Sequence, residues 1–201
     1  WSSDVCSSDL AEHLLFAVDS MFAAPEVDYH GPADDHATAE RVDGEDGQQA
    51  LRVTATGFDP EAHGSVVHLQ VPAGPADTGA LVDGTLVVRA RSLYGQTACF
   101  ELGLIQDTDH AYGVDVVLTR GWRDFRIPLK DLRPLWETPG GRCQPDRIRE
   151  LSVILGTWLF GRDAALPHGI EIERITVEPA PGLWEVPVSA SDAPPVLLDP
   201  D

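Results

Sequence analysis

Short runs in which apolar and polar residues alternate recur along most of this chain. Residues 97–105, for example, place Phe100, Leu102 and Leu104 on one side and Glu101 on the other. A period of two is the pattern of a β-strand with one buried face. Glycine, proline or aspartate closes most runs, as expected where turns join strands. The runs cover residues 49–56, 65–71, 83–92, 97–105, 112–119, 122–129, 151–156 and 169–178.

Strands of this length at this spacing predict an all-β fold, an antiparallel β-sandwich. Strands do not alternate with helices along the chain, which argues against a parallel α/β sheet. Residues 12–22 differ because four apolar residues recur there at helical spacing, so we expect a short N-terminal helix or the remnant of an upstream region. Residues 25–37 are rich in Pro, Asp, His and Gly and predict a loop.

The two ends of the chain differ in composition from the region between them. The first ten residues, WSSDVCSSDL, have no apolar period and match one reading frame of a common sequencing-library adapter, TGGAGTTCAGACGTGTGCTCTTCCGATCT. We therefore expect residues 1–10 to be an artefact that does not pack on the fold. Residues 180–201 are rich in Pro, Ser and Asp and predict a linker to a downstream region, with one extended piece at 184–188. One sandwich domain is expected at 25–179, preceded by the short segment 11–24.

The chain of 201 residues is strongly acidic, with 33 Asp and Glu against 14 Lys and Arg and a net charge of −19. Such a surface repels phosphate backbones and anionic lipid headgroups, so neither nucleic acid nor membrane is an expected partner. Cys99 and Cys143 lie in no zinc motif, and no cofactor is expected. We expect Cys99 in the core, and a disulfide between the two cysteines is open. The acidic turn at 43–47, DGEDG, leaves a structural calcium site as an alternative to a simple turn.

The sequence offers little for catalysis. Glu171 and Glu173 are two apart and would share a strand face, as a carboxylate pair in a sandwich-type glycoside hydrolase could. No serine nucleophile motif of the GxSxG type is present. We therefore expect no catalytic activity from this chain.

Polar residues on the middle strands are the better candidates for a functional site. Arg89, Arg91, Glu101 and Asp115 lie opposite the apolar face of their strands, and guanidinium and carboxylate groups pair well with sugar hydroxyls. Tyr94 and Trp158 lie in expected loops, where an aromatic ring could stack on a sugar. Trp136 and Phe160 are further aromatic candidates. The alternative is that the charged residues only form ion pairs on the outer faces of a sandwich.

Three segments, in order, resemble the galactose-binding-like β-sandwiches that occur as accessory modules of glycoside hydrolases. They are DGQQALRV at 46–53, GWRDFRIPLKDL at 121–132, and RIRELSVILG at 147–156 with GIEIERITVE at 169–178. The resemblance covers about 25–179 and implies a jelly-roll sandwich. It departs at Glu173 and Arg174, where the family often has aspartates that help hold calcium, and this weakens the calcium expectation.

This resemblance also implies a function. We expect a non-catalytic carbohydrate-binding-like module of a larger carbohydrate-active protein. The compartment is left open by the sequence, with a location outside the cytoplasm favoured. The partners of the module would be a glycan or a neighbouring domain of the same chain. The two alternatives are a structural module that packs between domains without binding sugar, and a fragment of a sandwich-type glycoside hydrolase.

Overall fold

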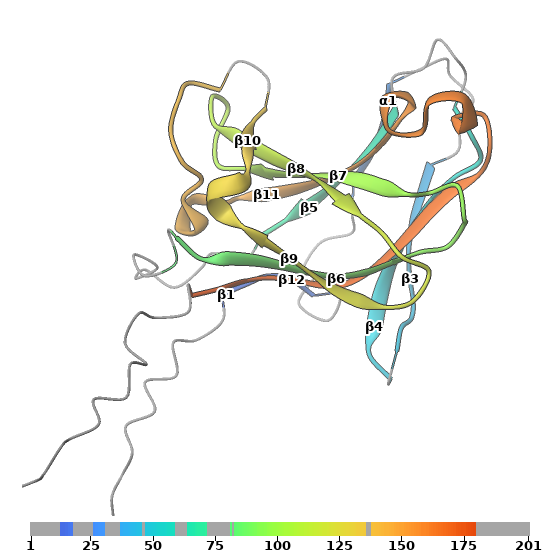
Figure 1. Cartoon of the computed structure of the whole chain (residues 1–201), viewed down its shortest axis with the longest axis horizontal. Helices are drawn as coiled ribbons and strands as arrows, with labels where there is room; N and C mark the ends of the chain where they lie inside the picture. The colour runs from blue at the N-terminus through green and yellow to red at the C-terminus, as the bar shows by residue number, and fades with distance from the viewer. Residues whose placement is uncertain are drawn as a thin grey trace, which may run out of the picture.

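The computed structural model describes residues 13–17, 26–30, 37–45, 47–58, 64–71, 81, 83–135 and 138–179. These residues form two antiparallel sheets that pack face to face as a β-sandwich (Figure 1). The expected all-β sandwich is therefore confirmed.

The first sheet has the strand order β3-β4-β12-β6-β9, and β1 also pairs with β12. β12 is the longest strand, and it pairs with β4 through its first half and with β1 through its second half. The strands are β1 (His13–Ala17), β3 (Ala37–Asp43), β4 (Gln49–Ala55), β6 (Thr85–Ser92), β9 (Arg123–Pro128) and β12 (His168–Glu178).

The second sheet has the order β10-β8-β7-β11-β5-β2. Its strands are β2 (Glu26–His30), β5 (Gly64–Gln70), β7 (Cys99–Ile105), β8 (Ala111–Val117), β10 (Arg133–Pro134) and β11 (Glu150–Gly156). Helical turns lie in the connections: η3 (Leu129–Asp131), η4 (Pro145–Arg147), α1 (Thr157–Phe160) and η5 (Gly161–Asp163).

The core lies between the sheets and is built by alternate residues of each strand. Leu86, Val88 and Ala90 of β6 face it from the first sheet, and Phe100 and Leu102 of β7 face it from the second, all fully buried. Burial of apolar area stabilises a fold by about 25 cal/mol per Å², so this layer is the main source of stability. The intervening residues point to the two outer faces of the sandwich.

Each of the eight expected strands is present, with ends that differ from the expected ones by up to two residues. Two other expectations are wrong. Residues 13–17 form strand β1 rather than a helix, because the second half of β12 offers an edge for pairing, whereas a short isolated helix is marginal in water. Residues 26–30 of the expected loop form β2, which pairs with β5 along all five of its residues.

The predictions for residues 1–10 and 180–201 lie outside the described residues. Within the part of the chain that the structure describes, no helix is long and apolar enough to cross a membrane.

Candidate functional site

The six predicted site residues are divided between the two outer faces of the sandwich. Arg89 and Arg91 lie on β6, in the first sheet, whereas Glu101 and Asp115 lie on β7 and β8, in the second. The expectation that these four form one polar face is therefore wrong. Alternation along each strand placed them correctly on an outer side, but it does not say which sheet a strand joins.

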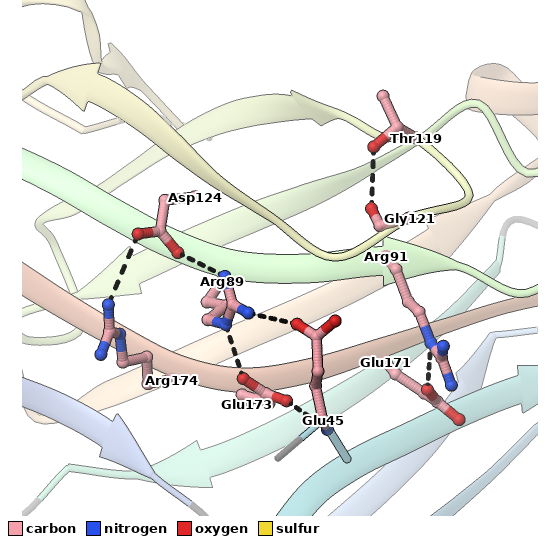
Figure 2. Close-up of polar contacts among 9 residues, drawn as sticks. All are labelled: Glu45, Arg89, Arg91, Thr119, Gly121, Asp124, Glu171, Glu173 and Arg174. Atoms are coloured by element: carbon pink, nitrogen blue, oxygen red, sulfur yellow. Dashed lines mark hydrogen bonds and ion pairs between the residues drawn. The ribbon is translucent and has the colours of Figure 1, made fainter. Parts of the chain in front are cut away.

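Arg89 is the centre of an ion-pair cluster on the outer face of the first sheet (Figure 2). Its Nε donates to Glu173 at 2.7 Å, its Nη1 to Asp124 at 3.3 Å and its Nη2 to Glu45. A bulge in β12 between Ile172 and Arg174 leaves Glu173 as the extra residue beside Arg89. Burial lowers the pKa of Arg89, but the hydrogen bonds to Glu173 and Asp124 outweigh it, so the pKa is raised.

A second cluster on the same face surrounds Glu171, whose side chain is fully buried. Arg52 donates to Oε1 from Nε at 2.9 Å and from Nη2 at 2.6 Å. Arg91 donates to Oε2 from Nε at 2.6 Å. The ring of Trp122 lies over the Arg91 guanidinium, with Cζ 4.9 Å from the ring centroid.

The acids and guanidinium groups of the first face are therefore bound to one another. Glu171 and Glu173, the pair considered for catalysis, are both buried under arginines. Tyr94 also lies on this side, over Gly169, where an added Cβ would come 3.0 Å from its Cε2. Its side chain is 38% exposed, less than that of Trp158. The charged side chains of the first face therefore stabilise the fold.

The outer face of the second sheet carries a different charge cluster. Arg133 of β10 forms a fork with Asp115, Nη2 to Oδ1 at 2.9 Å and Nη1 to Oδ2 at 3.2 Å. Its Nη2 also donates to Glu101 Oε1 at 3.2 Å. The hydrogen bond to Asp115 is the first cause of a raised pKa for Arg133. The Arg133 side chain is 51% exposed and that of Asp115 is 40% exposed, so both present polar atoms to solvent.

Trp158 lies on the same outer face. It belongs to α1, which continues directly from β11, and it is 55% exposed. Its ring covers Gly156, because a Cβ built on that glycine would lie 2.6 Å from Trp158 Cε3. Gly156 pairs with Gly64 of β5, so two residues without side chains lie side by side next to the ring. The indole is thus placed as an aromatic surface beside the sheet.

Strand register relates Trp158 to the charge cluster. Glu101 lies opposite both Asp115 and Ile154. Gly156 is two residues beyond Ile154 on the same face of β11, which is about 7 Å along the strand. Glu101 is therefore the member of the cluster that lies nearest to the aromatic surface. Arg133 is on the same face but farther away, because β10 and α1 lie at opposite ends of the second sheet (Figure 1).

A further polar group lies on β5 and β11. His68 Nδ1 is 2.5 Å from Glu150 Oε1, and Gln70 Nε2 donates to Glu150 Oε2 at 3.3 Å. Ser152, opposite His68 and Gly103, is 2% exposed, and its hydroxyl has no hydrogen-bond partner among the described residues. From Gly156 to Glu150 this face extends over the seven residues of β11, about 20 Å.

The expectation that Cys99 lies in the core is wrong, and the open question of a disulfide is answered by two free thiols. Cys99 faces outward and is half-buried, while Cys143 is in the core; both are free thiols. Burial, with a smaller contribution from the charge of Asp146, raises the pKa of the Cys143 thiol to about 12, so it is unreactive. Phe160 is buried against His168, with ring centroids 3.5 Å apart, and therefore is not a surface aromatic. Trp136 lies outside the described residues.

Within the described residues, no group of three or more His, Cys, Asp or Glu side chains could hold a metal ion. In the acidic turn after β3, the backbone N–H of Glu45 donates to Glu173 at 2.7 Å, and its carboxylate binds Arg89.

No sequence pattern pointed to Arg133, His68 or Glu150 as site residues. Arg133 precedes Pro134 in a stretch that resembles a loop, and β10 is too short to show alternation. His68 and Glu150 are 82 residues apart and meet only through the pairing of β5 with β11.

Comparison with known proteins gives no family model and no curated protein that matches this sequence. The fold, however, has solved counterparts. The family 11 carbohydrate-binding module from Clostridium thermocellum, in complex with a β-1,3-1,4-mixed-linked tetrasaccharide, has a TM-score of 0.64 at 10% identity. That match covers 85% of this chain and 97% of the module.

Two further structures agree. The family 11 module of the Clostridium thermocellum cellulosomal cellulase Lic26A-Cel5E has a TM-score of 0.61 at 11% identity, over 84% of this chain and 95% of the module. An exo-β-agarase has a TM-score of 0.55 at 14% identity, over 86% of this chain but 26% of the agarase chain. The chain therefore shares the β-sandwich fold of these carbohydrate-binding modules.

Proposed function

We propose that this chain is a non-catalytic module that binds a glycan on the outer face of the second sheet. One observation carries the proposal: Trp158 is half exposed over Gly156 on the outer face that also carries the Arg133, Glu101 and Asp115 cluster, with Glu101 nearest to it. An aromatic ring can stack on the C–H face of a sugar, while guanidinium and carboxylate groups bind its hydroxyls. Ligand sites commonly combine apolar surface with a few placed polar groups in this way.

The same face favours an uncharged glycan. Its described polar groups include three carboxylates, Glu101, Asp115 and Glu150, against one guanidinium. The whole chain carries a net charge of −19. A uronic or sulfated sugar would be repelled by this field, whereas a neutral sugar would not. The length of the face, about 20 Å, suits an oligosaccharide better than a single ring.

A binding module of this kind acts by proximity. It would hold a glycan near a catalytic domain of the same longer protein and so raise the effective concentration of substrate without chemistry of its own. The non-catalytic assignment is supported by Glu171 and Glu173, which are buried and paired with arginines rather than directed into an open site.

Isothermal titration calorimetry against a panel of glycans tests the proposal. The panel should include mixed-linked β-1,3-1,4-glucan oligosaccharides and agaro-oligosaccharides. We expect binding that Trp158→Ala weakens about tenfold or more, because the stacking surface is removed. Tyr94→Ala, an aromatic deletion on the opposite sheet, is the matched control and should bind as the unaltered chain does.

Two results would contradict the proposal. If Tyr94→Ala rather than Trp158→Ala abolishes binding, the ligand lies on the first sheet. If no glycan binds at millimolar concentration, a structural module that packs against neighbouring domains becomes the better assignment.

A further inference from the structure

The edge strand β10 poses a physical problem. It has two residues, Arg133 and Pro134, and a proline cannot donate a ladder hydrogen bond. So short a strand gains little from pairing, yet it carries the guanidinium that binds both Glu101 and Asp115. The Arg133 side chain is also long and half exposed, so holding it in one geometry costs conformational entropy.

Packing of Leu135 holds this short edge strand in place. Leu135 lies two residues after Arg133, so both side chains project over the outer face of the second sheet. Its side chain fills the space above Gly113 of β8: a Cβ built there would meet Leu135 Cδ1 at 2.7 Å, Cδ2 at 2.9 Å and Cγ at 2.9 Å. The neighbouring Gly103 of β7 borders the same space, with Leu135 Cδ1 3.5 Å from its Cβ position.

Gly103 and Gly113 are paired directly across β7 and β8, so together they form a notch one residue wide. Leu135 is buried in that notch, which accounts for two adjacent glycines in the middle of strands where glycine otherwise costs stability. The backbone is held as well. Leu135 N–H donates to the Ala111 carbonyl at 2.8 Å, and Thr138 Oγ1 accepts from Ala111 N–H at 3.0 Å.

We infer that Leu135, seated in the Gly103–Gly113 notch, is the positioning residue that aims Arg133 at the glycan. This inference rests on the proposed function for its binding consequence only. The placement of Arg133 itself is a property of the free protein. Leu135 acts through Arg133, and it need not touch the ligand.

Two substitutions disturb the notch from opposite sides. Leu135→Ala removes the side chain, and Gly113→Ala places a methyl group where the leucine now lies. The matched controls are Leu14→Ala, a partly exposed leucine on the first sheet, and Gly121→Ala, whose Cβ would meet no atom within 4 Å. Arg133→Gln is the reference for complete loss of the guanidinium, and thermal unfolding checks that each variant folds.

The first readout needs no ligand. We expect the ¹⁵N–¹H NMR signals of the Arg133 guanidinium, assigned by their disappearance in Arg133→Gln, to move to the positions of solvent-exposed arginines in both notch variants. They should be unchanged in both controls. Unchanged signals in Leu135→Ala and Gly113→Ala would overturn the inference.

The second readout is a double-mutant cycle on glycan affinity. Arg133→Gln and Leu135→Ala should each weaken binding about tenfold, as expected for the loss of a charge-assisted hydrogen bond. The double variant should be no weaker than Arg133→Gln alone. Losses that multiply would show that Leu135 acts independently of Arg133 and would overturn the inference. If the unaltered chain binds no glycan, the proposed function fails while the guanidinium signals still decide the role of Leu135.

Discussion

The carboxylate of Glu171 is fully buried on what is formally an outer face of the sandwich. Arg52 occupies one oxygen and Arg91 the other, and Trp122 covers Arg91. A buried charge is tolerated only when it is paired and hydrogen-bonded, and both conditions are met at this residue. The same arginines that would suit a sugar hydroxyl are thereby committed to the fold.

Glu171→Gln should therefore destabilise the protein strongly. The substitution preserves shape but leaves two arginines facing a neutral amide, and breaking a buried pair costs about 3 kcal/mol or more. For a domain of this size, that corresponds to a fall in Tm of roughly 6–12 °C, measurable by calorimetry. The control is Glu178→Gln, which removes a carboxylate that pairs with Arg126 and is more exposed than Glu171. This substitution should cost less than about 1 kcal/mol. Equal losses in the two variants would show that the burial of Glu171 does not matter.

At the scale of elements, α1 and β11 together determine how Trp158 is presented. α1 has four residues, begins after Gly156 without a side-chain cap, and ends at Gly161, whose φ of 54° favours glycine. So short a helix has little stability of its own. Packing of Phe160 into the core and of Trp158 over Gly156 holds it in place.

Gly156→Ala tests this arrangement while leaving the indole side chain in the protein. The backbone at residue 156, with φ −144° and ψ 160°, is compatible with alanine, so the fold should be retained. The new methyl group would overlap the ring, and Trp158 must lift away from the sheet. We expect a shift in tryptophan fluorescence and glycan binding that is about three- to tenfold weaker. Unaltered affinity with a clearly shifted spectrum would mean that the ring orientation is not used in binding.

The elements also show how much of the fold could be predicted from the sequence alone. Strands such as β6 and β7 were predictable because one face of each is buried and their alternation is clear. β1 and β2 were not, because their pairing with β12 and β5 comes from distant parts of the chain. The separation of Arg89 from Glu101 depends on the same long-range pairing, which divides the predicted polar face between the two sheets. Trp158 was predictable as an aromatic residue after a strand, although it lies in the short helix α1 rather than in a loop. Arg133 was not predictable.

Over the whole molecule, the two outer faces differ in how their charges are used. The first face pairs Glu45, Glu171, Glu173 and Asp124 with arginines within the fold. The second face leaves Arg133 and Asp115 half exposed beside an exposed tryptophan. The charges of the first face are thus used within the fold, whereas those of the second remain partly open to solvent, and the proposed glycan site rests on this difference.

His168 links the two sheets at the end of the sandwich that carries α1. It starts β12 of the first sheet, and its fully buried ring stacks on Phe160 of α1. Nδ1 lies 3.3 Å from the Thr97 hydroxyl, just before β7, and Nε2 lies 3.1 Å from the Asp163 carbonyl. A neutral ring with its proton on Nε2 satisfies both contacts, since the Thr97 hydroxyl can donate to Nδ1.

Burial lowers the pKa of His168 below its ordinary value of 6.5. Hydrogen bonds to the backbone of Asp163 and Ala164 and the charge of Asp163 raise the pKa, but they are weaker and do not reverse the shift. The unfolded chain therefore binds this proton more readily than the folded protein does. The free energy of unfolding should fall as the pH drops below about 6.5, towards the lower pKa of the folded state, and should not depend on this group at higher pH.

Unfolding followed at pH 7.5, 6.5 and 5.5 measures this dependence. By pH 5.5 the contribution of His168 can reach about 1.4 kcal/mol, a fall in Tm of roughly 3–5 °C. His168→Gln should be less stable at pH 7.5, because the ring stacking is lost, but should show a shallower loss of stability between pH 7.5 and 5.5. Equal slopes in the unaltered chain and His168→Gln would mean that another group controls the acid sensitivity of the sandwich.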